Sequence, residues 1–213
     1  MKFGKYLRNN MISRYEEIYI DYKGLKKLLM DLGAIEEERK SKQTKQPHGN
    51  NNNNNNNNNK NYILQFQASQ QVSDRNSKFL LSVWNQFQKV DRFIQDNEKD
   101  LSSKSNYMES SKDAQLIISC IKEIEELQNF VQLNLDGFRK ILKKFDKKFT
   151  ITIGHEYFKN MIYSHFQAKI SVLNYYNTKL SNIYSLFFGD PEELKNSERS
   201  ESGVFSFCMD EQE

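Results

Sequence analysis

The chain has 213 residues, enough for one domain with a real core, and carries a net charge of +3. It has fifteen Phe and eleven Tyr but only eight Gly and two Pro, too few for an all-β protein with many turns, so long helices are expected. Two cysteines far apart favour an intracellular protein without a disulfide. No apolar run reaches the ~20 residues that span a bilayer, and no signal peptide is evident, so we expect a soluble or at most peripheral protein, in the cytoplasm or nucleus.

Residues 1–35 predict a basic helical hairpin. Up to Met30 there are seven Lys or Arg and three Asp or Glu. Asp21 is a candidate N-cap for a helix that runs through Leu32 and beyond. A short helix near Lys2–Leu7 is expected to pack back on that helix. The apolar residues at helical steps are Tyr15, Ile18, Tyr22, Leu25, Leu29 and Leu32.

Residues 36–74 are predicted to be a connection between helices. A charged segment is broken by Pro47 and Gly49, and ten consecutive asparagines follow. Such a tract has no apolar surface to bury, so we expect a disordered, inert Asn-rich insertion at about 41–61.

Two long amphipathic helices, residues 75–104 and 113–149, are predicted to form an antiparallel pair across a polar break at Ser102–Asp113. The first carries a seven-residue repeat with Leu80, Phe87, Ile94 and Leu101, and with Val83 and Val90 between them. The second carries Ile117, Ile124, Val131, Phe138 and Phe145, with Ile121, Leu135 and Leu142 in the second core position.

The C-terminal third predicts a turn with Gly154 and a short helix within residues 150–163, then a long helix over 164–188. Residues 189–213 read as an acidic, disordered tail with a small apolar segment at 204–209. The fold class we expect is all-α: an N-terminal helical hairpin packed on an elongated three-helix bundle with a short additional helix. The expected repeat in the last long helix is Phe166, Leu173, Leu180 and Phe187.

Residues 135–149 combine an apolar face with a row of lysines. From Arg139 to Lys148 six Lys or Arg accompany a single acid, Asp146. Lysines on the exposed face of an amphipathic helix often interact only with water. An exposed helix face without a binding role, however, normally carries both acidic and basic side chains. The row therefore favours a polyanionic ligand. It does not distinguish nucleic acid, an acidic membrane and a phosphate ester.

The sequence offers no catalytic or metal-binding pattern. His155-Glu156 lacks a second histidine at zinc-protease spacing, and GFRKILKK does not match a phosphate-binding loop. We therefore expect neither enzymatic activity nor a cofactor nor a metal. Nucleic-acid binding is an alternative, opposed by the acidic tail and the lack of a recognised motif. A membrane-surface role fits less well, because the aromatic residues beside the lysines are spaced for burial.

Three stretches, MKFGKYL, YKGLKKLL and DGFRKILKKFDKK, resemble in this order the conserved blocks of the SPX domain. The resemblance covers about residues 1–188, with the variable insertion where the family tolerates length changes. It implies binding of inositol polyphosphates, especially inositol pyrophosphates, at a site that senses phosphate status. The ligand-binding residues it implies are Lys2, Tyr22, Lys26, Lys140, Lys143, Lys144 and Lys147, with Lys23, Lys27 and Lys148 at the rim.

We therefore expect a phosphate-status sensor that regulates a protein partner or an attached module. Many members of the family carry a second module, such as a polyphosphate-synthesising domain, a transporter or a ubiquitin-ligase finger. Here the sequence ends roughly 25 residues after the last predicted helix, so the chain is either a stand-alone sensor or a piece of a longer protein. A helical interaction scaffold that senses nothing is the other hypothesis, using the seven-residue seams or the segment 204–209.

Overall fold

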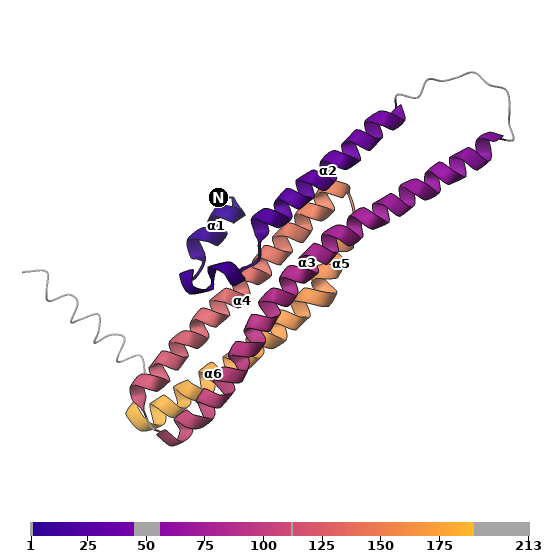
Figure 1. The fold of residues 1–213 in the computed structure, drawn as a ribbon. Helices are drawn as coiled ribbons and strands as arrows, with labels where there is room; N and C mark the ends of the chain where they lie inside the picture. The colour runs from indigo at the N-terminus through magenta and orange to yellow at the C-terminus, as the bar shows by residue number, and fades with distance from the viewer. Residues whose placement is uncertain (1, 45–55, 112, 190–213) are drawn as a thin grey trace, which may run out of the picture. The chain divides into compact units, whose positions relative to one another are not determined.

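The computed structural model describes residues 2–44, 56–111 and 113–189, and every regular element in these ranges is helical (Figure 1). The helices are α1 (Phe3–Asn10), the 3-10 helix η1 (Ser13–Ile18), α2 (Tyr22–Thr44), α3 (Asn56–Ser111), α4 (Ala114–Phe149), α5 (Ile153–Tyr157), the π-helix η2 (Phe158–Tyr163) and α6 (Ser164–Phe188). The all-α class is confirmed. The predicted tail and most of the Asn tract lie outside the described residues.

Two helices are longer than the sequence predicted. α2 continues to Thr44 and α3 begins at Asn56, so much of the expected connection at 36–74 is helical. α2 ends shortly before Pro47, because the residue that precedes a proline is disfavoured in a helix. Between Gly49 and Ser111 there is neither a glycine nor a proline, so neither residue type interrupts α3 on either side of its amphipathic core. Beyond Ser111, the Asp113 carboxylate accepts a hydrogen bond from the Leu116 amide at 3.1 Å and caps the start of α4.

The chain divides into two compact units. The first, called the site unit here, comprises Met1–Phe93 and Phe130–Gln167, and the second comprises Ile94–Asn129 and the chain from Ala168 onward.

The site unit has an aromatic core. Phe79 of α3 and Phe145 of α4 are fully buried and stack with their ring centroids 4.4 Å apart. The expectation that Leu80 occupies this position is wrong, since Leu80 is only half-buried. Phe79 lies eleven residues before the buried Val90, and eleven residues of a straight helix return to within roughly 20° of the same face, so Phe79 faces the core. Further along, Phe87, Phe138 and Phe166 lie within 6.3 Å of one another by ring centroids.

The second unit buries most of the predicted apolar repeat of its three helical segments. Ile94, Ile117, Ile124, Leu173 and Leu180 are all fully buried. Ile121, expected in the second core position, is only half-buried, and its neighbour Cys120 is buried instead. The expected core residue Phe187 is 46% exposed instead, and Tyr184 is buried one turn earlier. Ion pairs at the helix surfaces join Lys169 to Glu98 and Lys179 to Glu109, each at 2.6 Å.

The turn after α4 depends on Thr150 rather than on Gly154. Thr150 has φ 55°, and the Ile151 amide donates to the Asp146 carbonyl at 3.1 Å, the bond of a Schellman helix end. Gly154 instead lies in α5, where a Cβ would come within 2.9 Å of the Leu142 carbonyl. The glycine therefore allows α5 to approach α4 closely.

Candidate functional site

The site unit contains a cavity of about 740 Å³, called the basic cavity here. Its wall is formed by α1 and α2, by the segment that joins them, by one residue of α3 and by one of α4. The charged and polar residues that line it are Lys2, Lys5, Arg8, Glu16, Glu17, Tyr19, Asp21, Tyr22, Lys23, Lys26, Lys89 and Lys144.

Cations dominate the wall of the basic cavity, with seven Lys or Arg against three carboxylates. One of these carboxylates has a structural role: Asp21 accepts a hydrogen bond from the Gly24 amide at 2.7 Å, which confirms it as the N-cap of α2. A cavity with this excess of positive charge attracts anions and is well suited to a ligand with several phosphates.

Tyr22 is a buried residue in this wall, with 5% of its surface exposed. Its ring packs edge-to-face on Phe3 of α1, with the centroids 4.9 Å apart. Its hydroxyl is buried and has no hydrogen-bond partner among the described residues, and burial raises the pKa of Tyr22. A buried hydroxyl without a partner costs roughly 1–3 kcal/mol, so Tyr22 is a donor ready for a ligand oxygen.

Three side chains hold the segment that leads into Tyr22, residues 17–21, called the linker here. Lys89 Nζ donates to the carbonyls of Glu17 and Tyr19 at 3.1 and 2.8 Å. The amide of Ile20 donates to Asn134 Oδ1 at 2.8 Å, and the amide of Asp21 donates to Gln86 Oε1 at 3.0 Å. Asn134 is fully buried and donates in turn to the Phe130 carbonyl. The linker is therefore fixed to α3 and α4 through its own backbone.

The burial of Lys89 affects its ionisation. Desolvation lowers the pKa of Lys89, and the nearby Asp21 carboxylate acts in the opposite direction. Lys89 is the residue of α3 that lines the basic cavity.

Four of the seven site residues implied by the resemblance line the basic cavity: Lys2, Tyr22, Lys26 and Lys144. Lys140 lies on the same side of α4, with its Nζ 5.4 Å from the centroid of the Phe3 ring. Lys143 and Lys147 are exposed on α4 and do not belong to the cavity wall. Of the expected rim residues, Lys23 lines the cavity, whereas Lys27 is exposed outside the wall.

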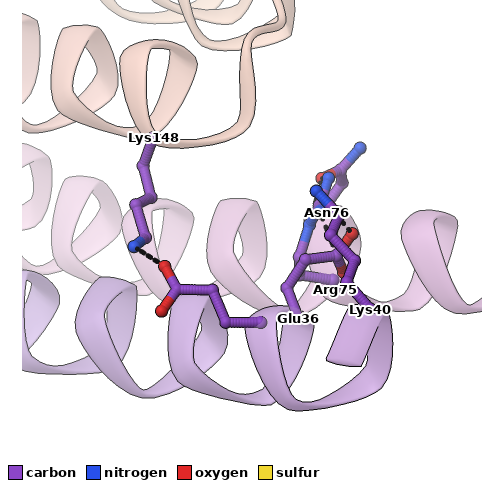
Figure 2. A network of polar contacts seen from close by, with 6 residues as sticks. Glu36, Lys40, Arg75, Asn76 and Lys148 are labelled. Carbon is purple, nitrogen blue, oxygen red and sulfur yellow. Dashed lines mark hydrogen bonds and ion pairs between the residues drawn. The ribbon is translucent and has the colours of Figure 1, made fainter. Parts of the chain in front are cut away.

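Lys148, the third expected rim residue, is engaged elsewhere. Its Nζ lies 2.7 Å from Glu37 Oε1 on α2, and this contact lowers the pKa of Glu37. The dashed line from Lys148 in Figure 2 marks this ion pair. Beside it, the buried Arg75 of α3 (labelled in Figure 2) pairs with Glu36 at 3.2 Å. The Arg75 guanidinium also lies over the Phe149 ring, 3.8 Å from the ring centroid. Lys148 therefore helps to fasten the end of α4 to α2.

The sequence pattern missed Lys5, Arg8 and Lys89 in the wall. Lys5 and Arg8 follow Lys2 in the basic N-terminal segment, so the helical spacing of α1 could have suggested them. No local signal marks Lys89, because its partners are backbone carbonyls that lie 70 and 72 residues away in the sequence.

Asp146, the acid within the lysine row, has a structural role. Its carboxylate accepts hydrogen bonds from the amides of Gly154 and His155, both at 2.7 Å. Asp146 therefore caps the start of α5.

Neither metal chemistry nor a membrane span is indicated in the described ranges. They contain no cluster of three or more His, Cys, Asp and Glu residues that could hold a metal ion. His165 instead contacts Asp91 at 2.6 Å. No helix among these residues is long and apolar enough to cross a bilayer.

A family model of the SPX domain matches residues 1–82 and 66–161, which together make up most of the chain. This chain belongs to the SPX domain family.

Two curated relatives match over 169 residues, which is 70% of this chain. The phosphate system positive regulatory protein PHO81 of Saccharomyces cerevisiae is 28% identical, and the glycerophosphocholine phosphodiesterase GDE1 of Candida albicans is 27% identical. The match spans only 13% of the length of each relative.

Among solved structures, the chain is similar to the SPX domain of Chaetomium thermophilum glycerophosphodiester phosphodiesterase 1 in complex with inositol hexakisphosphate. The TM-score is 0.53 with 21% identity, covering 84% of this chain and 99% of the other. At this identity the likeness is one of fold.

Proposed function

We propose that this chain binds inositol polyphosphates, and inositol pyrophosphates in particular, in the basic cavity, and that occupancy reports phosphate status to a regulated protein or an attached module. The observation that carries the proposal is that Lys2, Lys26 and Lys144 line one cavity together with Tyr22, whose buried hydroxyl has no hydrogen-bond partner in the described chain.

The chemistry of the ligand follows from that arrangement. An inositol ring with six or more phosphates presents many acceptor oxygens in several directions, and it needs charged donors from more than one segment. Lys2 comes from the N-terminus of α1, Lys26 from the first turns of α2 and Lys144 from α4. Donors from three elements favour a compact polyanion over an extended strand of nucleic acid, which would require a continuous track.

Lys140, Lys143 and Lys147 belong to the proposal as an outer set. Lys143 and Lys147 are exposed on the helix that supplies Lys144, and Lys140 reaches Phe3 at the edge of α1. In this proposal they contact phosphates that project beyond the basic cavity, where the β-phosphate of a pyrophosphate would extend.

The comparisons support a role in phosphate regulation. A yeast relative is named as a regulator of the phosphate system, and the related SPX domain of known structure holds inositol hexakisphosphate. Because this chain matches only a small part of its curated relatives, the regulated partner is proposed by class alone. We assign the sensor domain to residues 1–188.

Isothermal titration calorimetry with inositol hexakisphosphate and an inositol pyrophosphate tests the site. Lys144→Met should weaken binding about tenfold or more, as expected for loss of a charge-assisted hydrogen bond. Lys122→Met is the matched control, since Lys122 is an exposed lysine of α4 outside the cavity wall. Equal affinities for wild type and Lys144→Met would remove Lys144 from the site.

Thermal unfolding distinguishes the sensor from the non-sensing scaffold. A ligand that binds only the folded state raises the melting temperature, and the stabilisation grows with the logarithm of the ratio of ligand concentration to dissociation constant. The sensor should therefore melt at a higher temperature with inositol hexakisphosphate, while a scaffold should not shift. Inorganic sulfate at equal ionic strength is the control for screening.

A further inference from the structure

Lys89 unites two roles that the remaining cavity lysines do not share. It lines the basic cavity, and its ammonium also holds the carbonyls of Glu17 and Tyr19 in the linker. An ammonium has three protons, so these two hydrogen bonds leave one proton for another acceptor.

The linker positions the groups on which the cavity depends. It ends at Asp21, which caps α2, and is followed directly by Tyr22, the first residue of α2, whose hydroxyl has no partner in the described chain. Asn134 and Gln86 accept hydrogen bonds from two amides of the linker, whereas Lys89 donates to two of its carbonyls. Lys89 is thus the one cation among the three side chains that hold the linker.

We infer that Lys89 is both a ligand-binding and a positioning residue, which gives its third proton to a bound phosphate while it fixes the linker that carries Tyr22. This inference rests on the proposed function. A phosphate in the cavity favours the charged form of Lys89, opposing the desolvation that the side chain otherwise experiences. A phosphate bound to the third proton joins the ligand, the Lys89 ammonium and the two linker carbonyls in one network, so occupancy of the cavity tightens the attachment of the hairpin to α3.

Binding of a phosphate depends on the charge of Lys89, whereas positioning of the linker depends on its hydrogen bonds to the two carbonyls. Three variants of the full chain test the two roles. Lys89→Met removes the charge and all three donors but keeps an unbranched stem of similar length. Gln86→Leu removes one hydrogen bond to the linker without changing any charge. Lys78→Met removes an exposed lysine of α3 that does not line the cavity.

Binding of inositol hexakisphosphate is measured by calorimetry at several salt concentrations. Lys89→Met should weaken binding roughly tenfold or more and reduce the dependence of affinity on salt, because one phosphate-contacting cation is lost. Gln86→Leu should lower the affinity less than Lys89→Met does, and its affinity should depend on salt as strongly as that of the wild type. Lys89→Arg, which retains the charge and the donors, should restore much of the affinity. Wild-type affinity and salt dependence in Lys89→Met would overturn the role in ligand binding.

Hydrogen exchange of residues 12–22, followed by mass spectrometry, measures the attachment separately. Without ligand, Lys89→Met and Gln86→Leu should both exchange faster there than Lys78→Met, and unchanged exchange in Lys89→Met would overturn the positioning role. With ligand, the linker of the wild type should gain protection that Lys89→Met lacks. If the wild type fails to bind, the proposed function fails together with the ligand-binding half of this inference, while exchange without ligand still decides the positioning half.

Discussion

Gly137 of α4 lies so close to Ile20 of the linker that a Cβ at residue 137 would come within 2.8 Å of Ile20 Cγ2. Ile20 is buried, and its amide is held by Asn134 three residues earlier on the same helix. The absent side chain at Gly137 is therefore what allows the linker to lie against α4.

Gly137→Ala should weaken binding of inositol hexakisphosphate several-fold by pushing the linker away from α4. Alanine gains roughly 1 kcal/mol of helix propensity over glycine, but overpacking costs about 1–3 kcal/mol, so the free energy of unfolding should be unchanged or lower. Calorimetry and urea unfolding measure the two effects. The double variant Gly137→Ala/Ile20→Ala removes the clash and should show favourable coupling in a double-mutant cycle. Purely additive effects would show that the close approach has no consequence.

Tyr22→Phe should separate ligand binding from stability. Because the hydroxyl has no partner in the described chain, its removal should leave the free energy of unfolding unchanged or raise it by up to about 1 kcal/mol. Affinity for inositol hexakisphosphate should nevertheless fall, roughly tenfold. Tyr6→Phe is the control, since Tyr6 is 42% exposed on α1 and does not line the cavity. A clear loss of stability in Tyr22→Phe without loss of affinity would contradict the assignment.

Lys144 and Lys148 lie one turn apart on α4 but should respond differently to substitution by methionine. Lys148 pairs with Glu37, and only Lys144 lines the basic cavity. Lys148→Met should keep the affinity for inositol hexakisphosphate within about twofold, since screening weakens its distant effect on the ligand, and should slightly lower the melting temperature. Similar losses of affinity in both variants would indicate that the lysine row acts through its total charge.

Asp146→Ala should destabilise the protein although it removes an acid from a strongly basic stretch. It eliminates the two hydrogen bonds that cap α5, which should lower the free energy of unfolding by about 1–2 kcal/mol. Asp136→Ala, on the same helix, removes only a surface pair with Arg139 and should change stability by less than about 1 kcal/mol. Urea unfolding compares them. Equal stabilities for the two variants would show that the cap is unimportant.

Cys120 should resist alkylation in the folded protein. Burial, together with the nearby Glu123, raises its pKa from about 9.0 to about 11, so little thiolate is present at neutral pH. In a Cys208→Ser variant, iodoacetamide should modify residue 120 only after unfolding. Because the folded state holds the proton more tightly, stability should fall as the pH rises from about 9 to about 11 and should not respond to this group below that window. Rapid alkylation under native conditions would contradict the burial.

The fold was largely predictable because burial follows helical spacing. Ile117, Ile124 and Phe138 were predicted to be core residues and are fully buried, and Asp21 was predicted to cap α2. The ends of α3 were not predictable from the apolar pattern, since the helix continues through polar residues where no glycine or proline interrupts it. Phe79 was missed because strict seven-residue counting ignores the drift of a straight helix.

The site was predictable only in part. The resemblance brought Lys2, Tyr22, Lys26 and Lys144 together, and these four do line one cavity. Lys143 and Lys147, which the resemblance assigns to the same site, are exposed on α4 outside the cavity wall. The place of Lys89 in the site can be recognised only in the tertiary structure, because its partners are backbone carbonyl oxygens of a distant segment and no residue type in the sequence marks them.

The wall of the basic cavity includes both Lys2, at the start of the chain, and Lys144, near the end of α4. During synthesis on the ribosome, the N-terminal helices emerge long before α4 exists, so a nascent chain has no complete pocket to offer a polyphosphate. If the chain binds inositol polyphosphates as proposed, recognition therefore follows the synthesis of α4 and cannot guide the folding of the helices that precede it.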